Sequence, residues 1–69
     1  MSLPEMTPVQ SSNVSAVGHD GTDLFVTFKS GRTYRYAGAA QEYDDLVSAG
    51  SVGAHFNDNI KDIYPTRAV

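Results

Sequence analysis

Residues 23–36 read DLFVTFKSGRTYRY, two runs of aromatic and β-branched residues separated by a short polar turn. Such runs are typical of β-strands, because these side chains pack well on a pleated surface. Residues 29–31 fit a three-residue hairpin loop in which Gly31 takes the left-handed conformation that other residues avoid. The segment therefore predicts an antiparallel hairpin that ends at Tyr36.

The length of this loop decides which side chains share a face of the hairpin, because a slip of one residue moves every side chain to the other face. A three-residue loop places Val26 opposite Tyr34. The large side chains of the hairpin then share one face: Leu24, Val26, Phe28, Tyr34 and Tyr36. A two-residue loop would instead group both tyrosines with Phe25 and Thr27. We favour the three-residue loop because it gathers the large side chains for a core.

A further strand is expected before the hairpin, over residues 13–19. Alternation along this strand places Val14 and Ala16 on one face and Val17 on the other. The Asp20-Gly21 pair predicts a turn that joins it to the hairpin, since glycine accepts a positive φ and aspartate bonds to the backbone that follows.

Two short helices are expected after the hairpin. Residues 40–49 carry apolar side chains at helical spacing and predict the first helix. Ser51 is a suitable N-cap for the second helix, which runs to about residue 61. The apolar residues of this second segment, up to Ile63, are spaced for one buried face, and Pro65 is expected to end regular structure.

This order of elements predicts an α+β fold: a three-stranded antiparallel β-meander followed by two short helices packed on one face. Residues 1–8 contain two prolines and no periodic pattern, so we expect a flexible N-terminal lead-in. Residues 9–67 are expected to form a single domain, because a chain of 69 residues is too short for two.

The composition of the chain limits how it can be stabilised and where it can work. There is no cysteine, so disulfides are excluded, and His19 and His55 lie too far apart in sequence to suggest a zinc site; no cofactor is expected. Because a core this small gives a narrow margin of stability, we predict a homo-oligomer. The chain has neither signal-peptide regions nor an apolar run near the ~20 residues of a membrane helix, so we expect a cytoplasmic protein without a membrane partner.

The chain is acidic, with a net charge of −3, but its charges are unevenly distributed. Three of its five basic residues lie in the hairpin: Lys29, Arg32 and Arg35. Tyr34 and Tyr36 alternate with Arg35 and therefore face the other side of the strand. Aromatic side chains on a sheet can stack nucleic-acid bases while nearby cations contact phosphates, so these five residues are the first candidate site for RNA or another anionic partner. The alternative, which the apolar face favours, is that the helices cover both tyrosine rings and leave Arg35 as solvated surface.

A second candidate site lies at the start of the second helix and comprises Ser51, Gly53 and Asn57. Glycine in the first turn of a helix costs about 1 kcal/mol relative to alanine, but it allows a ligand phosphate or a neighbouring element to approach closely. Close packing is the simpler of these two explanations. Nothing in the sequence predicts catalysis, because the chain lacks a cysteine nucleophile, a Ser-His-Asp arrangement and a glycine-rich phosphate loop with lysine.

Several short motifs occur in an order that is familiar: Ser11-Ser12-Asn13-Val14, Gly18-His19-Asp20, Ser30-Gly31, Tyr34-Arg35-Tyr36, Ser51-Val52-Gly53-Ala54-His55-Phe56-Asn57 and Ile60 to Tyr64. In this order and spacing the chain resembles the KTSC family over residues 9–67. That short domain is found at the C-terminus of some bacterial lysyl-tRNA synthetases and as a stand-alone protein in bacteria and phages. The resemblance implies a single small domain, and RNA binding is the function suggested for the family. Residues 37–40 depart from the family pattern, which more often has a bulky residue and a Val-Pro helix start.

Three functions are consistent with these candidates. The first is a small non-catalytic binding module of the KTSC type that contacts RNA or another anionic partner through residues 29–36. The second is a protein–protein or self-association module, encoded by a bacterium or a phage, that uses exposed apolar surface such as Phe25. The third is a site for a nucleotide-type ligand at a protomer interface, near residues 51–57.

Overall fold

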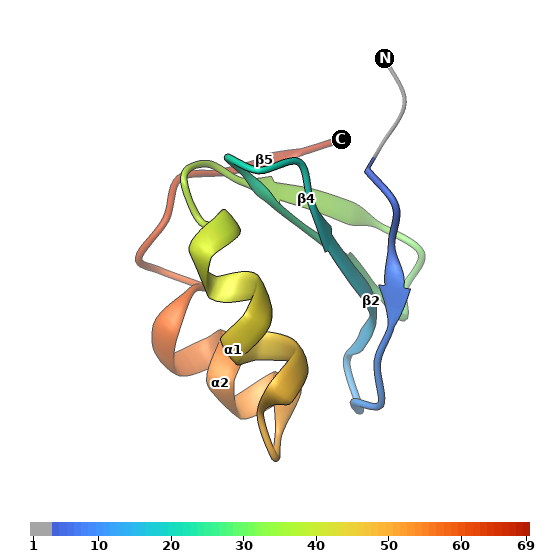
Figure 1. The fold of residues 1–69 in the computed structure, drawn as a ribbon. Helices are drawn as coiled ribbons and strands as arrows, with labels where there is room; N and C mark the ends of the chain where they lie inside the picture. Colours follow the sequence, from blue (N-terminus) through green and yellow to red (C-terminus); the bar gives the residue numbers. More distant parts are fainter. Residues whose placement is uncertain (1–3) are drawn as a thin grey trace.

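The computed structural model describes residues 4–69, which form a five-stranded antiparallel sheet with helices against one of its faces (Figure 1). The strands follow one another across the sheet in chain order. Along the chain the elements are β1 (Thr7–Pro8), β2 (Val14–His19), β3 (Leu24–Phe28), β4 (Thr33–Tyr36), the 3₁₀ helix η1 (Ala40–Glu42), α1 (Tyr43–Ser48), α2 (Val52–Asn59) and β5 (Thr66–Ala68). The α+β class, the antiparallel sheet and the two helices are confirmed, whereas the prediction of three strands is wrong.

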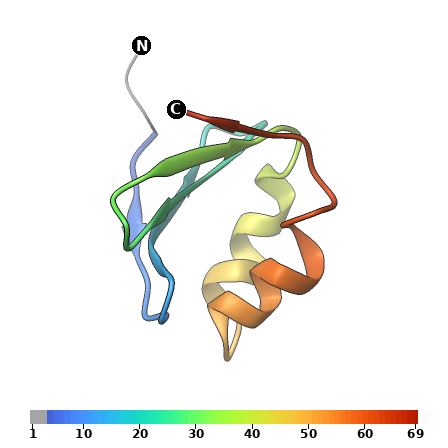
Figure 2. The same cartoon turned by 180° about the vertical axis from the view of Figure 1, so that it is seen from behind.

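The two strands that the sequence did not predict, β1 and β5, are the outer strands of the sheet. β1 lies within the expected lead-in, of which residues 1–3 are outside the described residues, and it pairs with β2. β5, red in Figure 2, follows Pro65, where we expected regular structure to end, and it pairs with β4. Both strands are two or three residues long and exposed along their whole length. Backbone pairing places them without any alternation of apolar side chains, so the sequence pattern gave no signal for them.

The hairpin of β3 and β4 has the predicted three-residue loop. Val26 lies opposite Tyr34, as that loop length requires. Gly31 has a φ of 96°, and its N–H donates to the carbonyl oxygen of Phe28 at 2.9 Å. The N–H of Phe28 in turn donates to the carbonyl oxygen of Arg32 at 2.8 Å and closes the loop.

The core lies between the inner face of the sheet and the helices, which lie side by side against that face (Figures 1 and 2). The largest fully buried side chains are Val14, Val17, Leu24, Val26, Leu46 and Ile60. Each such side chain contributes roughly 1.5–3 kcal/mol when it is fully buried. Val14 and Val17 both belong to this core, contrary to the alternation we expected, because a β-bulge shifts the register between Val14 and Ala16.

Two other apolar residues have environments that we did not expect. Ile63 is 63% exposed, because α2 ends before it and helical spacing no longer applies. Phe25 is only 6% exposed, although it follows the opposite alternation to its inward-facing neighbours. A side chain on Gly18, which pairs with Phe25, would meet the Glu5 backbone and the Met6 sulfur, so the segment before β1 covers this part of the sheet. Phe25 therefore offers no exposed surface for self-association.

The helical segments are shorter than predicted. The first expected helix is split into the single 3₁₀ turn η1 and the six residues of α1. Ser51 is the N-cap of α2, as predicted, and its Oγ accepts a hydrogen bond from the Ala54 N–H at 3.3 Å. None of the helices in residues 4–69 is long and apolar enough to cross a membrane.

Candidate functional site

An open groove of about 650 Å³ lies between the β3–β4 hairpin and α2. Its volume is in the range of small-ligand pockets, roughly 300–1,000 Å³. Residues from both predicted sites line it: Lys29, Arg32, Tyr34, Tyr36, Gly53 and Asn57. The fold thus brings together two groups of residues that the sequence suggested as separate sites.

Four aromatic rings line the groove, and we call them the aromatic floor: Phe28, Tyr34, Tyr36 and Phe56. Phe28 meets Tyr34 and Phe56 edge to face, with ring centroids 5.7 and 5.5 Å apart, and Tyr36 meets Phe56 in the same way at 5.3 Å. Tyr36 and Phe56 are buried, at 4% and 5% exposed, whereas Phe28 and Tyr34 are half-buried. The buried pair anchors the floor in the core, and the half-buried pair leaves ring surface open to the groove.

The buried tyrosine of the floor stays uncharged at neutral pH. Burial raises the pKa of the Tyr36 hydroxyl to about 12, and the neighbouring Tyr34 adds to the shift. Tyr36 therefore adds no negative charge to the groove under physiological conditions.

Three exposed cations also line the groove, and we call them the cationic rim: Lys29, Arg32 and Lys61. The ion pairs found within residues 4–69 involve none of them. Asp62 is the one acidic residue among those that line the groove. The groove is therefore locally positive, although the chain as a whole carries a charge of −3.

Lys61 was absent from the residues that the sequence analysis proposed. Gly53, Asn57 and Lys61 follow one another at intervals of four, which places them on one face of the helix that the sequence predicts to about residue 61, although α2 ends at Asn59 in the structure. This spacing is the signal that could have linked Lys61 to the second candidate site. No sequence pattern links it to the hairpin, because only the tertiary fold brings the two segments together.

Arg35, by contrast, is not brought together with the other predicted residues. Its Nε lies 2.9 Å from Oδ2 of Asp23, whose Oδ1 also accepts a hydrogen bond from the Gly38 N–H at 2.9 Å. Alternation along β4 separates Arg35 from Tyr34 and Tyr36, as predicted, and Arg35 is not among the residues that line the groove. Its contacts tie the end of the hairpin to the start of β3.

A smaller polar pocket of about 360 Å³ adjoins the groove. Ser51 lines this pocket, and Asn13, Gly53 and Asn57 line both cavities. A Cβ on Gly53 would lie 3.5 Å from the Oγ of Ser11, which is an ordinary contact. Close packing does not explain this glycine, contrary to the simpler of our two explanations.

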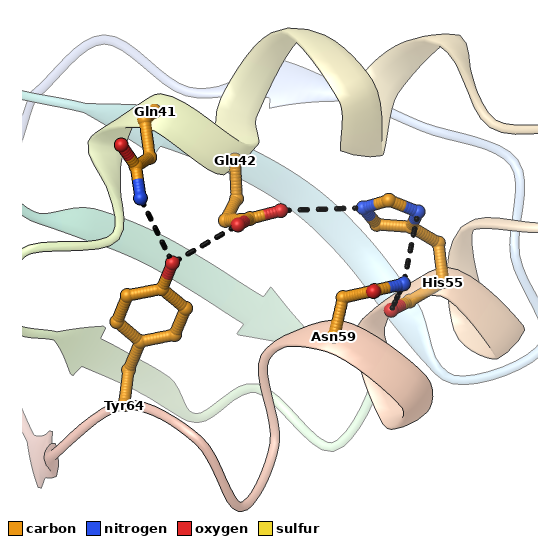
Figure 3. Close-up of polar contacts among 5 residues, drawn as sticks. All are labelled: Gln41, Glu42, His55, Asn59 and Tyr64. Atoms are coloured by element: carbon orange, nitrogen blue, oxygen red, sulfur yellow. Dashed lines mark hydrogen bonds and ion pairs between the residues drawn. The ribbon is translucent and has the colours of Figure 1, made fainter.

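A network of polar side chains, none of which lines the groove, connects α2 to its neighbours (Figure 3). The Tyr64 hydroxyl donates to Glu42 Oε2 at 2.9 Å and accepts from Gln41 Nε2 at 3.1 Å. Nε2 of His55 lies 3.6 Å from Glu42 Oε1, and Asn59 Nδ2 donates to the His55 carbonyl oxygen at 3.1 Å. The network joins η1, α2 and the segment that leads into β5.

The two histidines make separate contacts. His19 is exposed at the end of β2, where its Nδ1 accepts from the Gly21 N–H at 3.2 Å and its ring lies 4.6 Å from that of Tyr43. His55 belongs to the network of Figure 3. Within residues 4–69 no three His, Cys, Asp or Glu side chains are grouped so that they could hold a metal ion.

Comparison with known proteins places this fold and its motifs in a family. The model of the KTSC domain matches residues 10–64. The chain belongs to the KTSC domain family. The crystal structure of a KTSC domain protein from Yersinia pestis superposes with a TM-score of 0.87 and 29% sequence identity, over 94% of this chain and 96% of the other. A protein of Tsukamurella paurometabola is 39% identical to this KTSC domain in an alignment of 59 positions that covers 81% of this chain and 88% of the relative.

Proposed function

We propose that this KTSC domain is a non-catalytic binding module that holds single-stranded RNA in the groove between the β3–β4 hairpin and α2. The observation that carries the proposal is the position of the unpaired cationic rim beside the aromatic floor. A nucleic-acid strand carries one phosphate charge per nucleotide, and the release of counterions from those phosphates drives binding to cations. Flat rings beside the cations supply a surface on which unpaired bases stack, worth about 1–3 kcal/mol per base.

A single strand suits this groove better than a duplex. Stacking on Phe28 or Tyr34 requires a base that is free of its partner strand, because the rings are half-buried and cannot reach into a closed helix. A duplex would be bound through its phosphates alone and would leave the aromatic floor unused.

The overall acidity of the chain does not oppose this proposal, because all but one of its acidic residues lie outside the groove lining. Asp44 and Asp45 are in the first turn of α1, where the helix dipole favours negative charge. No residue of α1 lines the groove. Salt screens exposed charges with a Debye length of about 10 Å at 0.1 M, so the charges that line the groove have the strongest effect on a phosphate chain bound there.

The test compares charge reversals inside and outside the groove. We expect Arg32→Glu and Lys61→Glu each to weaken binding of a fluorescein-labelled ten-nucleotide oligo(U) by about tenfold or more, because each replaces a phosphate partner with a like charge. Fluorescence anisotropy at 0.1 M salt measures the affinity. These side chains are exposed, and circular dichroism verifies that the fold is kept.

Arg67→Glu is the matched control, since Arg67 is exposed on β5 and does not line the groove. It makes the same change in net charge as Arg32→Glu. Equal losses of affinity in Arg32→Glu and Arg67→Glu would show that binding follows net charge rather than the groove. Absence of measurable binding of oligo(U), oligo(A) and oligo(C) by the parent protein would refute RNA as the partner.

A further inference from the structure

Two side-chain amides lie where the groove meets the smaller polar pocket, those of Asn13 and Asn57. Both residues are exposed, and within residues 4–69 neither side-chain amide takes part in a hydrogen bond. Each amide offers an acceptor oxygen beside an amino group that donates twice. The junction therefore presents unused donors and acceptors in the same groove that the aromatic floor lines.

The polar pocket beyond this junction has a chemistry different from that of the groove. Its lining contains serines, glycines and amides and includes no charged residue. Phosphates are better held by the cationic rim, which lines the groove and not the pocket. A neutral lining rich in donors and acceptors matches the edge of a base instead.

We propose that this junction reads the edge of one adenine base, which stacks on Phe28 or Tyr34 while its phosphate meets the cationic rim. The inference deepens the proposed function and rests on it. An asparagine amide forms a bidentate pair with N6 and N7 of adenine, whereas guanine is more commonly read by arginine or lysine. The neutral junction thus favours adenine over guanine, and adenine has a wider ring system than the pyrimidines for stacking.

The first test separates the base from the phosphate without any substitution. We expect adenosine monophosphate to displace labelled oligo(A) at a concentration about tenfold lower than ribose 5-phosphate does, because the two share a phosphate and a ribose but only the first carries a base. Equal displacement by the two compounds would overturn base recognition.

The second test concerns the two amides. The parent protein should bind a ten-nucleotide oligo(A) about tenfold more tightly than oligo(C), and Asn57→Ala or Asn13→Ala should remove most of that preference. Asn59→Ala is the matched control, since it is the same substitution on the same helix and its side chain bonds to the His55 carbonyl oxygen outside the groove. The control should keep the preference for oligo(A).

The outcomes distinguish this inference from the proposed function. If rim variants weaken all homopolymers while oligo(A) and oligo(C) bind equally, base recognition is wrong and RNA binding in the groove stands. If Asn57→Ala weakens oligo(A) and oligo(C) by the same factor, the junction does not read the base, and RNA binding in the groove stands. If no homopolymer binds at all, both proposals are wrong.

Discussion

Gly31 is the residue of the hairpin loop that takes a positive φ. Its φ of 96° is in a region that side chains with a Cβ rarely adopt, although the space around it is open. We expect Gly31→Ala to lower the free energy of unfolding by about 1–2 kcal/mol, as an L-residue is held in a left-handed conformation. Urea unfolding followed by circular dichroism measures the change.

Gly50 provides the matched control for this prediction. It also lies in a turn with open space around it, but it does not have a positive φ. Gly50→Ala should leave the stability unchanged within about 0.5 kcal/mol or raise it slightly, since alanine restricts the unfolded chain. If both substitutions had the same effect, the conformation of Gly31 would not be what limits the loop.

The residue types of the hairpin were sufficient to predict which side chains share a face. Alternation and loop length placed Tyr34 and Tyr36 together and Arg35 apart, and the structure agrees. The sequence could not show that Tyr36 is buried while Tyr34 stays half-open, because that difference arises from contact with Phe56 on α2. Tyr36 accordingly fits the core interpretation, and Tyr34 retains surface for a ligand.

Among the elements, the segment between α2 and β5 is held in part by a hydrogen bond of Tyr64 that can be tested directly. The Tyr64 hydroxyl donates to a carboxylate of Glu42 whose side chain is 19% exposed. We expect Tyr64→Phe to cost about 1.5–3 kcal/mol of unfolding free energy, because the lost bond involves a charged acceptor that remains partly buried. Chemical denaturation measures the loss.

Tyr43→Phe serves as the comparison, since its hydroxyl bonds the exposed Thr7 Oγ1 at 2.8 Å and both groups are uncharged. It should cost less than about 1 kcal/mol, because water can replace the lost partner. A double-mutant cycle with Glu42→Gln assigns the Tyr64 effect to this pair. Additive losses in the cycle would mean that the Tyr64 hydroxyl acts through a partner other than Glu42, such as Gln41 Nε2.

Elements with a strong side-chain pattern were predicted, and those held by backbone pairing were not. The aromatic and β-branched run of β3 identified the central strand, and Ser51 identified the start of α2. β1 and β5 lack such patterns because both of their faces are exposed. The bulge that turns Val14 inward was equally hidden, since an inserted residue changes the alternation without changing the composition.

At the scale of the whole molecule, the sequence predicted an uneven charge distribution but not its geometry. The cations of the hairpin were recognised as a group, yet Arg35 pairs with Asp23 and Lys61 takes its place beside the groove. Lys61 lines the groove because two segments that are distant in sequence come into contact. The sequence of neither segment predicts that contact by itself. Self-association stays a prediction that rests on the small size of the chain. The molecular mass measured by sedimentation at several protein concentrations tests it.

The salt dependence of binding measures how many of these cations contact phosphate. For a single strand, the logarithm of the affinity falls with the logarithm of the salt concentration with a slope of about −0.7 per neutralised phosphate. The three cations of the rim should therefore give a slope of about −2 between 50 and 200 mM salt, despite the net charge of −3. Arg32→Gln should make the slope shallower by about 0.7, and Arg67→Gln should leave it unchanged. A slope near zero would mean that RNA is held by stacking and base contacts alone, and a slope that changes equally in both variants would place the phosphates outside the groove.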